Sequence, residues 1–125
     1  MDDLLYKELS YTLCGLAFDI DNKLGSGHSE KNYADALEIL LKKNNISYAR
    51  EVYSPMKIEG VVIKKKFFDF LIDNKIVLEL KVSTTKYRDA CRQLYQYLKS
   101  SNLKLGLIIR FTKDGVKIKR IPNIY

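Results

Sequence analysis

Residues 67–82 read FFDFLIDNKIVLELKV, two apolar runs separated by the polar segment of residues 73–75. Short runs of aromatic, β-branched and aliphatic residues on either side of Asp and Asn are typical of two β-strands joined by a turn. Both runs are apolar at almost every position rather than at every second one. Strands of this kind are buried on both faces, so we predict that this hairpin lies at the centre of a sheet.

Three charged residues interrupt these strands, Asp69 on the first and Glu79 and Lys81 on the second. Residues two apart in a strand point to the same face, so Glu79 and Lys81 share one. A three-residue turn pairs Ile72 with Ile76, and the same register places Asp69 opposite Glu79. Two carboxylates and an ammonium group therefore converge on one face of the sheet.

Two interpretations of this charged group stay open on these residues alone. Strands that face solvent often carry charges, and each cross-strand pair adds only about 0.2–1 kcal/mol. Burying two like charges in a central strand is costly, however, unless a cation or a bound proton relieves the repulsion. Hard cations such as Mg²⁺ bind carboxylate oxygens, and a nearby lysine can hold a water or stabilise a developing charge. The apolar surroundings favour the metal site.

The rest of the chain predicts helices and further strands around this hairpin. Apolar residues spaced three or four apart indicate helices over residues 8–23, 29–44 and 86–100, with Ser29 and the hydroxyls of residues 83–85 as candidate N-caps. The expected strands are residues 47–57, 61–72, 75–82, 105–111 and 116–121. A strand, a crossover helix and a parallel strand form a right-handed unit, so the sheet should be mixed.

Composition indicates one folded domain with an affinity for polyanions. The chain has 125 residues, of which 46% are hydrophobic, and its 22 Lys and Arg exceed its 15 Asp and Glu by seven. A basic surface favours nucleic acid as the partner class. No apolar run is long enough to cross a membrane, and Cys14 and Cys91 lie in apolar helical patterns, so we expect a cytoplasmic protein.

Two further spacings stand out on the expected helices. Gly27, Glu30 and Tyr33 place a carboxylate in the first turn of a helix and an aromatic ring one turn later, whereas Gln93 and Tyr97 share one face of the crossover helix. Each spacing alone has an ordinary structural explanation. Glu30 complements a helix dipole, and a tyrosine fills a core beside a polar flank.

Taken together and in this order, the motifs resemble the GxxExxY family of the PD-(D/E)XK nuclease superfamily over about residues 8–122. The matches are Gly27, Glu30 and Tyr33 to GxxExxY, Asp69 and Glu79-Leu80-Lys81 to D…ExK, and Gln93 and Tyr97 to QxxxY. The resemblance implies an α/β (α+β) fold with a restriction-endonuclease-like αβββαβ core, its mixed sheet flanked by helices. Residues 1–125 would form one such domain with an extra N-terminal helix. Phe68 replaces the proline of the superfamily's name.

The resemblance further implies a metal-dependent nuclease that uses Mg²⁺ or Mn²⁺ and acts on nucleic acid, with DNA as the first expectation. Asp69, Glu79 and the Leu80 carbonyl would bind the metal. Glu30 would add a carboxylate directly or through water, and Lys81 would position the attacking water.

Supporting or substrate-binding roles fall to Tyr33, Gln93, Tyr97, Arg88 and Arg92. The lysines of residues 64–66 and the arginines of the crossover helix would contact phosphates. The alternative is that they form an ordinary solvent-exposed face without a binding role. The alternative function is a non-catalytic module that binds nucleic acid or assembles a complex on the same fold. A homo-oligomer or a larger protein assembly stays open, as does the choice between DNA and RNA.

Overall fold

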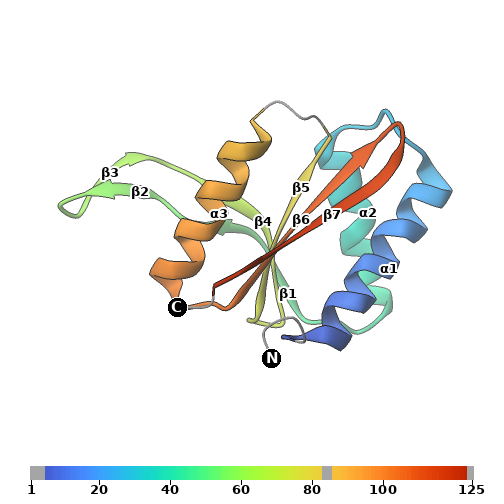
Figure 1. Cartoon of the computed structure of the whole chain (residues 1–125), viewed down its shortest axis with the longest axis horizontal. Coiled ribbons are helices and arrows are strands. Elements are labelled where there is room, and N and C mark those ends of the chain that lie inside the picture. The colour runs from blue at the N-terminus through green and yellow to red at the C-terminus, as the bar shows by residue number, and fades with distance from the viewer. Residues whose placement is uncertain (1–4, 83–85, 124–125) are drawn as a thin grey trace.

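The computed structural model describes residues 5–82 and 86–123. A five-stranded sheet carries α1 and α2 on one face and α3 on the other, and a two-stranded arm extends beyond it (Figure 1). The helices are α1 (Lys7–Leu24), α2 (Glu30–Lys43) and α3 (Tyr87–Ser101). The strands are β1 (Tyr48–Tyr53), β2 (Met56–Ile58), β3 (Val61–Lys64), β4 (Phe67–Ile72), β5 (Ile76–Lys81), β6 (Leu105–Thr112) and β7 (Gly115–Pro122).

The sheet is mixed, as the sequence predicts. Its strand order is β1-β4-β5-β6-β7, in which β5 and β6 run parallel and every other neighbouring pair runs antiparallel. The helix α3 makes the crossover between the two parallel strands, because a parallel connection cannot close through a tight turn. The predicted fold class, a mixed α/β sheet flanked by helices with an N-terminal helix added, is confirmed.

The central hairpin has the predicted register. Ile72 pairs with Ile76 and Phe70 with Leu78, across a turn that contains residues 73–75. Asp73 and Asn74 adopt positive φ angles of 52° and 54°, which these two residue types tolerate better than most. The register that brings Asp69 opposite Glu79 is therefore set by the length of this turn.

The two long strands predicted at residues 47–57 and 61–72 are each broken in the structure. The first divides into β1 and β2 at Ser54 and Pro55, and the second into β3 and β4 at residues 65–66. Proline has no N–H to donate to a ladder, which explains the first break. The outer pieces, β2 and β3, pair only with each other and form the projecting arm.

Helix ends agree with the sequence at α2 and differ at α3. The Ser29 hydroxyl accepts a hydrogen bond from the Asn32 N–H at 3.1 Å, so the predicted N-cap is confirmed. The helix α3 begins at Tyr87, with Lys86 at its N-cap position and without a side-chain cap. The candidate caps of residues 83–85 lie outside the described residues.

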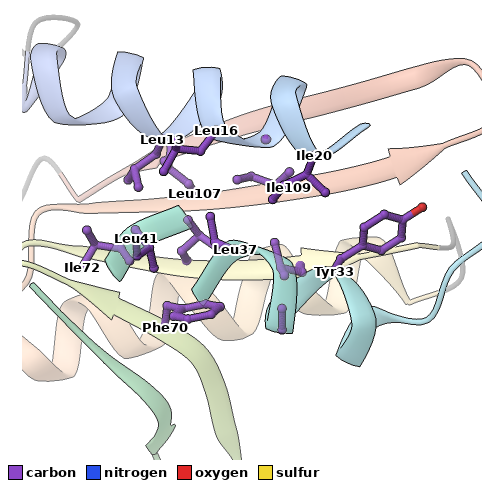
Figure 2. Packing of buried hydrophobic residues seen from close by; sticks show 14 of the residues in the cluster. Leu13, Leu16, Ile20, Tyr33, Leu37, Leu41, Phe70, Ile72, Leu107 and Ile109 are labelled. Carbon is purple, nitrogen blue, oxygen red and sulfur yellow. The ribbon is translucent and has the colours of Figure 1, made fainter. Parts of the chain in front are cut away.

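Apolar side chains fill both faces of the sheet. On one face, α1 and α2 pack against Phe70, Ile72 and the alternate residues of β5 and β6 (Figure 2). On the other face, Leu94 and Leu98 of α3 pack against Val77 and the neighbouring strands. Because residues 76, 78 and 80 of β5 face α1 and α2, Glu79 and Lys81 point toward the α3 side.

Gly106 lies where β6 approaches α3 most closely, and it gives the first testable prediction. A methyl group at this position would lie 2.8 Å from Leu94 Cδ2 and 2.9 Å from Leu94 Cγ. Leu94 is fully buried, so the core must shift, and we expect Gly106→Ala to lower the free energy of unfolding by about 1–3 kcal/mol. Urea unfolding measures the loss.

The helical Gly15 is the matched control, because a Cβ there would meet nothing within 4 Å. Gly15→Ala should stabilise the protein by about 1 kcal/mol, since alanine favours a helix interior over glycine. Equal stability changes for the two variants would contradict the proposed close packing of β6 against α3.

Candidate active site

Asp69 and Glu79 are locked together by backbone hydrogen bonds at the point where β4 separates from β5. The pairs between these strands extend from Ile72 and Ile76 to Phe70 and Leu78. Beyond that point the side-chain carboxylates accept hydrogen bonds from backbone N–H groups. The Asp69 N–H donates to Glu79 Oε1 at 3.0 Å, and the Leu80 N–H donates to Asp69 Oδ2 at 2.7 Å. Asp69 and Glu79 thus lie next to each other, as the predicted register requires.

The electrostatics of this pair are those of two neighbouring carboxylates, one of them largely buried. Burial and repulsion from Asp69 raise the pKa of Glu79 to about 8, against the lowering effect of Lys81. The Lys81 ammonium lies 4.0 Å from Glu79 Oε2, and the Lys81 and Glu79 side chains are 23% and 16% exposed. One lysine at this distance therefore only partly offsets the repulsion between the carboxylates.

Glu30 approaches the same end of β5 from the first turn of α2. Its Oε2 accepts a hydrogen bond from the Val82 N–H at 3.3 Å, immediately after Lys81. Within residues 5–82 and 86–123, no three metal-ligating side chains of the His, Cys, Asp and Glu types form one cluster. The structure thus joins Asp69 to Glu79 directly and brings Glu30 to the backbone that follows β5, without joining it to the carboxylate pair.

Tyr33 holds the turn that delivers Glu30. Its ring is fully buried and stacks on Phe111, with the ring centroids 4.0 Å apart. Its hydroxyl donates to the Gly25 carbonyl at 2.6 Å, and Gly27 in the same turn has a φ of 94° that favours glycine. The first and third residues of the Gly27, Glu30, Tyr33 motif therefore shape the turn, and only Glu30 reaches the end of β5.

A cavity of about 260 Å³ opens over Glu79 and Lys81. Its lining residues are Lys64, Phe68, Glu79, Lys81, Lys86, Asp89, Ala90 and Gln93. Gln93 reaches this cavity from α3, as its position on the crossover helix predicts. Tyr97 lies one turn further on and packs its ring against Phe68, with the centroids 4.9 Å apart.

Arg88 and Arg92 do not line this cavity. Both side chains are exposed on the neighbouring flank of α3, and Arg92 forms an ion pair with Asp89 at 3.1 Å. An exposed pair of this kind contributes little to stability and leaves both charges in water. The structure therefore brings Gln93 to the carboxylates but leaves the two arginines on the outer surface.

Arg110 is a residue near the site that the sequence reasoning missed. It pairs with Lys81 across the parallel strands β5 and β6, and its guanidinium lies 4.4 Å from the Tyr87 ring centroid. Its Nε is buried without a hydrogen-bond partner in the described part of the chain. A single charged residue in the apolar run of β6 was the available signal, but only the parallel register shows its neighbour.

The donor set of this site fits a divalent metal ion. Two carboxylates from adjacent strands and the nearby backbone carbonyl of Leu80 are oxygen ligands, which Mg²⁺ and Mn²⁺ prefer over nitrogen or sulfur. Burial and the neighbouring Asp69 raise the pKa of Glu79, and a bound cation would favour its charged form. Asp69 and Glu79 would hold the ion, whereas the described part of the chain shows Glu30 only in a hydrogen bond from the Val82 N–H, outside a three-carboxylate cluster.

A mixed sheet flanked by helices, with an Asp and an ExK sequence on adjacent central strands, defines a nuclease-like fold. The chain belongs to the PD-(D/E)XK nuclease superfamily, whose family model matches residues 7–121. Among solved structures, it is similar to the crystal structure of SSO0001, with 26% sequence identity and a TM-score of 0.57. That match covers 74% of this chain but only 49% of SSO0001, so the chain spans about half of that protein's length. No curated protein matches the chain significantly.

The described residues contain no helix that is both long and apolar enough to span a membrane.

Proposed function

We propose that this protein is a divalent-metal-dependent nuclease that hydrolyses phosphodiester bonds, with DNA as its substrate. The observation that carries the proposal is the carboxylate pair of Asp69 and Glu79, fixed by backbone hydrogen bonds beside Lys81. A surface that only bound nucleic acid would gain nothing from two carboxylates that repel phosphates. Membership of the superfamily supports the same chemistry.

Each residue of the site has a role that its position supports. Asp69, Glu79 and the Leu80 carbonyl bind Mg²⁺ or Mn²⁺, and Glu30 contributes directly or through water. The bound ion supplies a Lewis acid and lowers the pKa of a bound water. Lys81 holds the attacking water and stabilises the charge that develops on the phosphate.

The remaining assignments extend this proposal. Gln93 contacts the substrate from the wall of the cavity, Tyr97 braces that wall, and Tyr33 supports the turn before Glu30. The GxxExxY motif of Gly27, Glu30 and Tyr33 supports membership of the family of that name within the superfamily. Residues 1–125 form its nuclease-like domain.

The direct test is cleavage of labelled single- and double-stranded DNA and RNA with Mg²⁺, Mn²⁺ or EDTA. We expect cleavage that requires the metal, together with its loss in Glu79→Ala. Persistent cleavage by Glu79→Ala would indicate a contaminating nuclease. If no nucleic acid is cut with either metal, the non-catalytic binding module becomes the better reading of this fold.

Metal binding itself is testable without activity. Because a bound cation relieves the repulsion between Asp69 and Glu79, Mg²⁺ or Mn²⁺ should raise the free energy of unfolding by about 2.7 kcal/mol at a hundredfold excess over its dissociation constant. Thermal melting with and without metal measures this effect. Asp69→Asn should respond less, and equal shifts in both proteins would count against a specific metal site.

A further inference from the structure

We propose that a groove between the β2–β3 arm and α3 binds a single-stranded nucleic acid and leads it into the carboxylate cavity. The proposal deepens the nuclease function and rests on it. The groove has a volume of about 330 Å³ and lies outside the residues that the superfamily motifs single out, except for Gln93 and Tyr97. Its lining residues are Ser54, Pro55, Met56, Lys57, Lys66, Gln93, Gln96, Tyr97 and Ser100.

The break between β1 and β2 creates the groove. The Ser54 N–H donates to the Lys66 carbonyl at 2.8 Å, which closes the base of the arm. Beyond this bond the arm leaves the main sheet and extends past α3 (Figure 1). The arm therefore forms one wall, with Lys57 and Lys66, and α3 forms the other, with Gln96 and Ser100.

The groove adjoins the candidate active site, with which it shares one lining residue. Gln93 lines both hollows. Two lysines of the same chain segment follow the same path, because Lys64 lines the cavity and Lys66 lines the groove. Lysines alone carry charge in the groove lining, so it complements a phosphate backbone. Burial and repulsion from Lys64 lower the pKa of Lys66, and a phosphate placed between them would offset that repulsion.

Aromatic and amide groups accompany the lysines. Tyr97 lines the groove and packs against Phe68, which lines the cavity, so two adjoining rings connect the hollows. Proteins that bind single strands combine a basic groove with aromatic rings on which unpaired bases stack. Gln93 and Gln96 add donors and acceptors for exposed base edges.

The size of the groove favours one strand over a duplex. A volume of 330 Å³ equals a sphere about 9 Å across, whereas a DNA duplex as a whole is wider than its ~12 Å major groove. The carboxylates beyond it are recessed, since the Glu79 side chain is 16% exposed. A single strand can thread between the arm and α3, whereas a duplex would have to remain outside.

The test is strand binding in EDTA, where metal-dependent cleavage does not occur. A fluorescent 15-nucleotide DNA of mixed sequence is titrated by anisotropy as a single strand and as its blunt duplex. The variants are Lys57→Glu on the arm and Gln96→Glu on α3, both at exposed positions. Lys7→Glu on α1 is the control, because it makes the same charge change as Lys57→Glu on the opposite side of the sheet.

We expect the single strand to bind at least about tenfold more tightly than the duplex. Lys57→Glu and Gln96→Glu should each weaken single-strand binding about fivefold or more, and Lys57→Glu should lower the salt slope by about 0.7 or more. Lys7→Glu should change affinity less than about twofold. Duplex binding as tight as single-strand binding would overturn the proposal, as would equal effects of Lys57→Glu and Lys7→Glu.

Failure of this proposal is distinguishable from failure of the nuclease. If the protein binds the strand through Lys57 and Gln96 but never cleaves it, the groove proposal is supported and the nuclease proposal is refuted. Conversely, if Lys57→Glu and Lys7→Glu show equally fast metal-dependent cleavage at subsaturating substrate, the nuclease proposal is supported and the groove proposal is refuted.

Discussion

Replacing Glu79 by glutamine should strongly slow metal-dependent cleavage and at the same time stabilise the metal-free protein. Glutamine keeps a side-chain oxygen that can accept the hydrogen bond from the Asp69 N–H, so the local structure is retained. It removes the negative charge that burial and Asp69 destabilise. Loss of a metal ligand should slow cleavage by about 10³-fold, or about 4 kcal/mol of transition-state stabilisation.

The stability effect of this substitution depends on pH in a defined direction. The pKa of Glu79 is raised from 4.5 to about 8 in the native state, so the native state binds this proton more tightly than the unfolded state. In the wild type, the stability that this proton contributes is fully present below about pH 4.5 and is lost as the pH rises through about 8. At pH 9, the free energy of unfolding of Glu79→Gln should therefore be roughly 1–3 kcal/mol higher than that of the wild type.

Urea unfolding in EDTA across pH 5–9 measures this difference. The wild type should lose stability toward pH 9 more steeply than Glu79→Gln, and added Mg²⁺ should flatten the wild-type profile alone. Parallel profiles for the two proteins would show that Glu79 does not carry a buried like-charge repulsion. Glu38→Gln is the matched control. Hydrogen bonds from Tyr48 and Arg50 lower the pKa of Glu38 and outweigh the effect of its burial, so Glu38 lacks the raised pKa of Glu79.

The central hairpin could be predicted from sequence because its register depends on local features. Side chains alternate along a strand with a period of two, so the length of the turn at residues 73–75 decides which residues share a face. That rule predicts that Asp69 lies opposite Glu79. The same locality explains the agreement of the helix bounds, since α2 begins directly after a capping serine.

Other features depend on contacts that no local pattern contains. Glu30 reaches the Val82 N–H only because α2 packs beside the end of β5, and Arg110 meets Lys81 only through the parallel register. The arm and its groove arise because the chain separates from the main sheet at Pro55, so that β2 and β3 pair only with each other. A proline marks such a break in the sequence, but the direction of the arm follows from tertiary packing.

Lys81→Ala should slow the chemical step by about 10²–10³-fold, the usual cost of removing one group that stabilises developing charge. Lys81 is two residues from Glu79, lines the carboxylate cavity and is 23% exposed, so it can meet a substrate. Its ammonium group cannot ligate a metal ion. Removing this positive charge should therefore leave metal affinity intact or slightly raise it, because one repulsion toward the cation disappears.

Two further lysine and arginine variants separate chemistry from charge. Lys86→Ala removes the same charge from the same cavity without touching the ExK strand, and we expect less than about a tenfold loss of rate. Arg92 lies on the outer flank of α3. If it contacts a phosphate there, Arg92→Ala should weaken binding and lower the salt slope by about one unit. Single-turnover rates at saturating protein report only the step that follows binding.

The combination of rate and metal affinity decides between the two functions proposed for this fold. A slow Lys81→Ala that still gains stability from Mg²⁺ has lost catalysis while keeping the carboxylate pair of Asp69 and Glu79. A slow variant that no longer responds to Mg²⁺ would mean that Lys81 supports the structure of the site instead. If Lys81→Ala cleaves at the wild-type rate, the lysine of the ExK sequence has no catalytic role. If neither protein cuts any nucleic acid with metal present, the binding module becomes the function that this site supports.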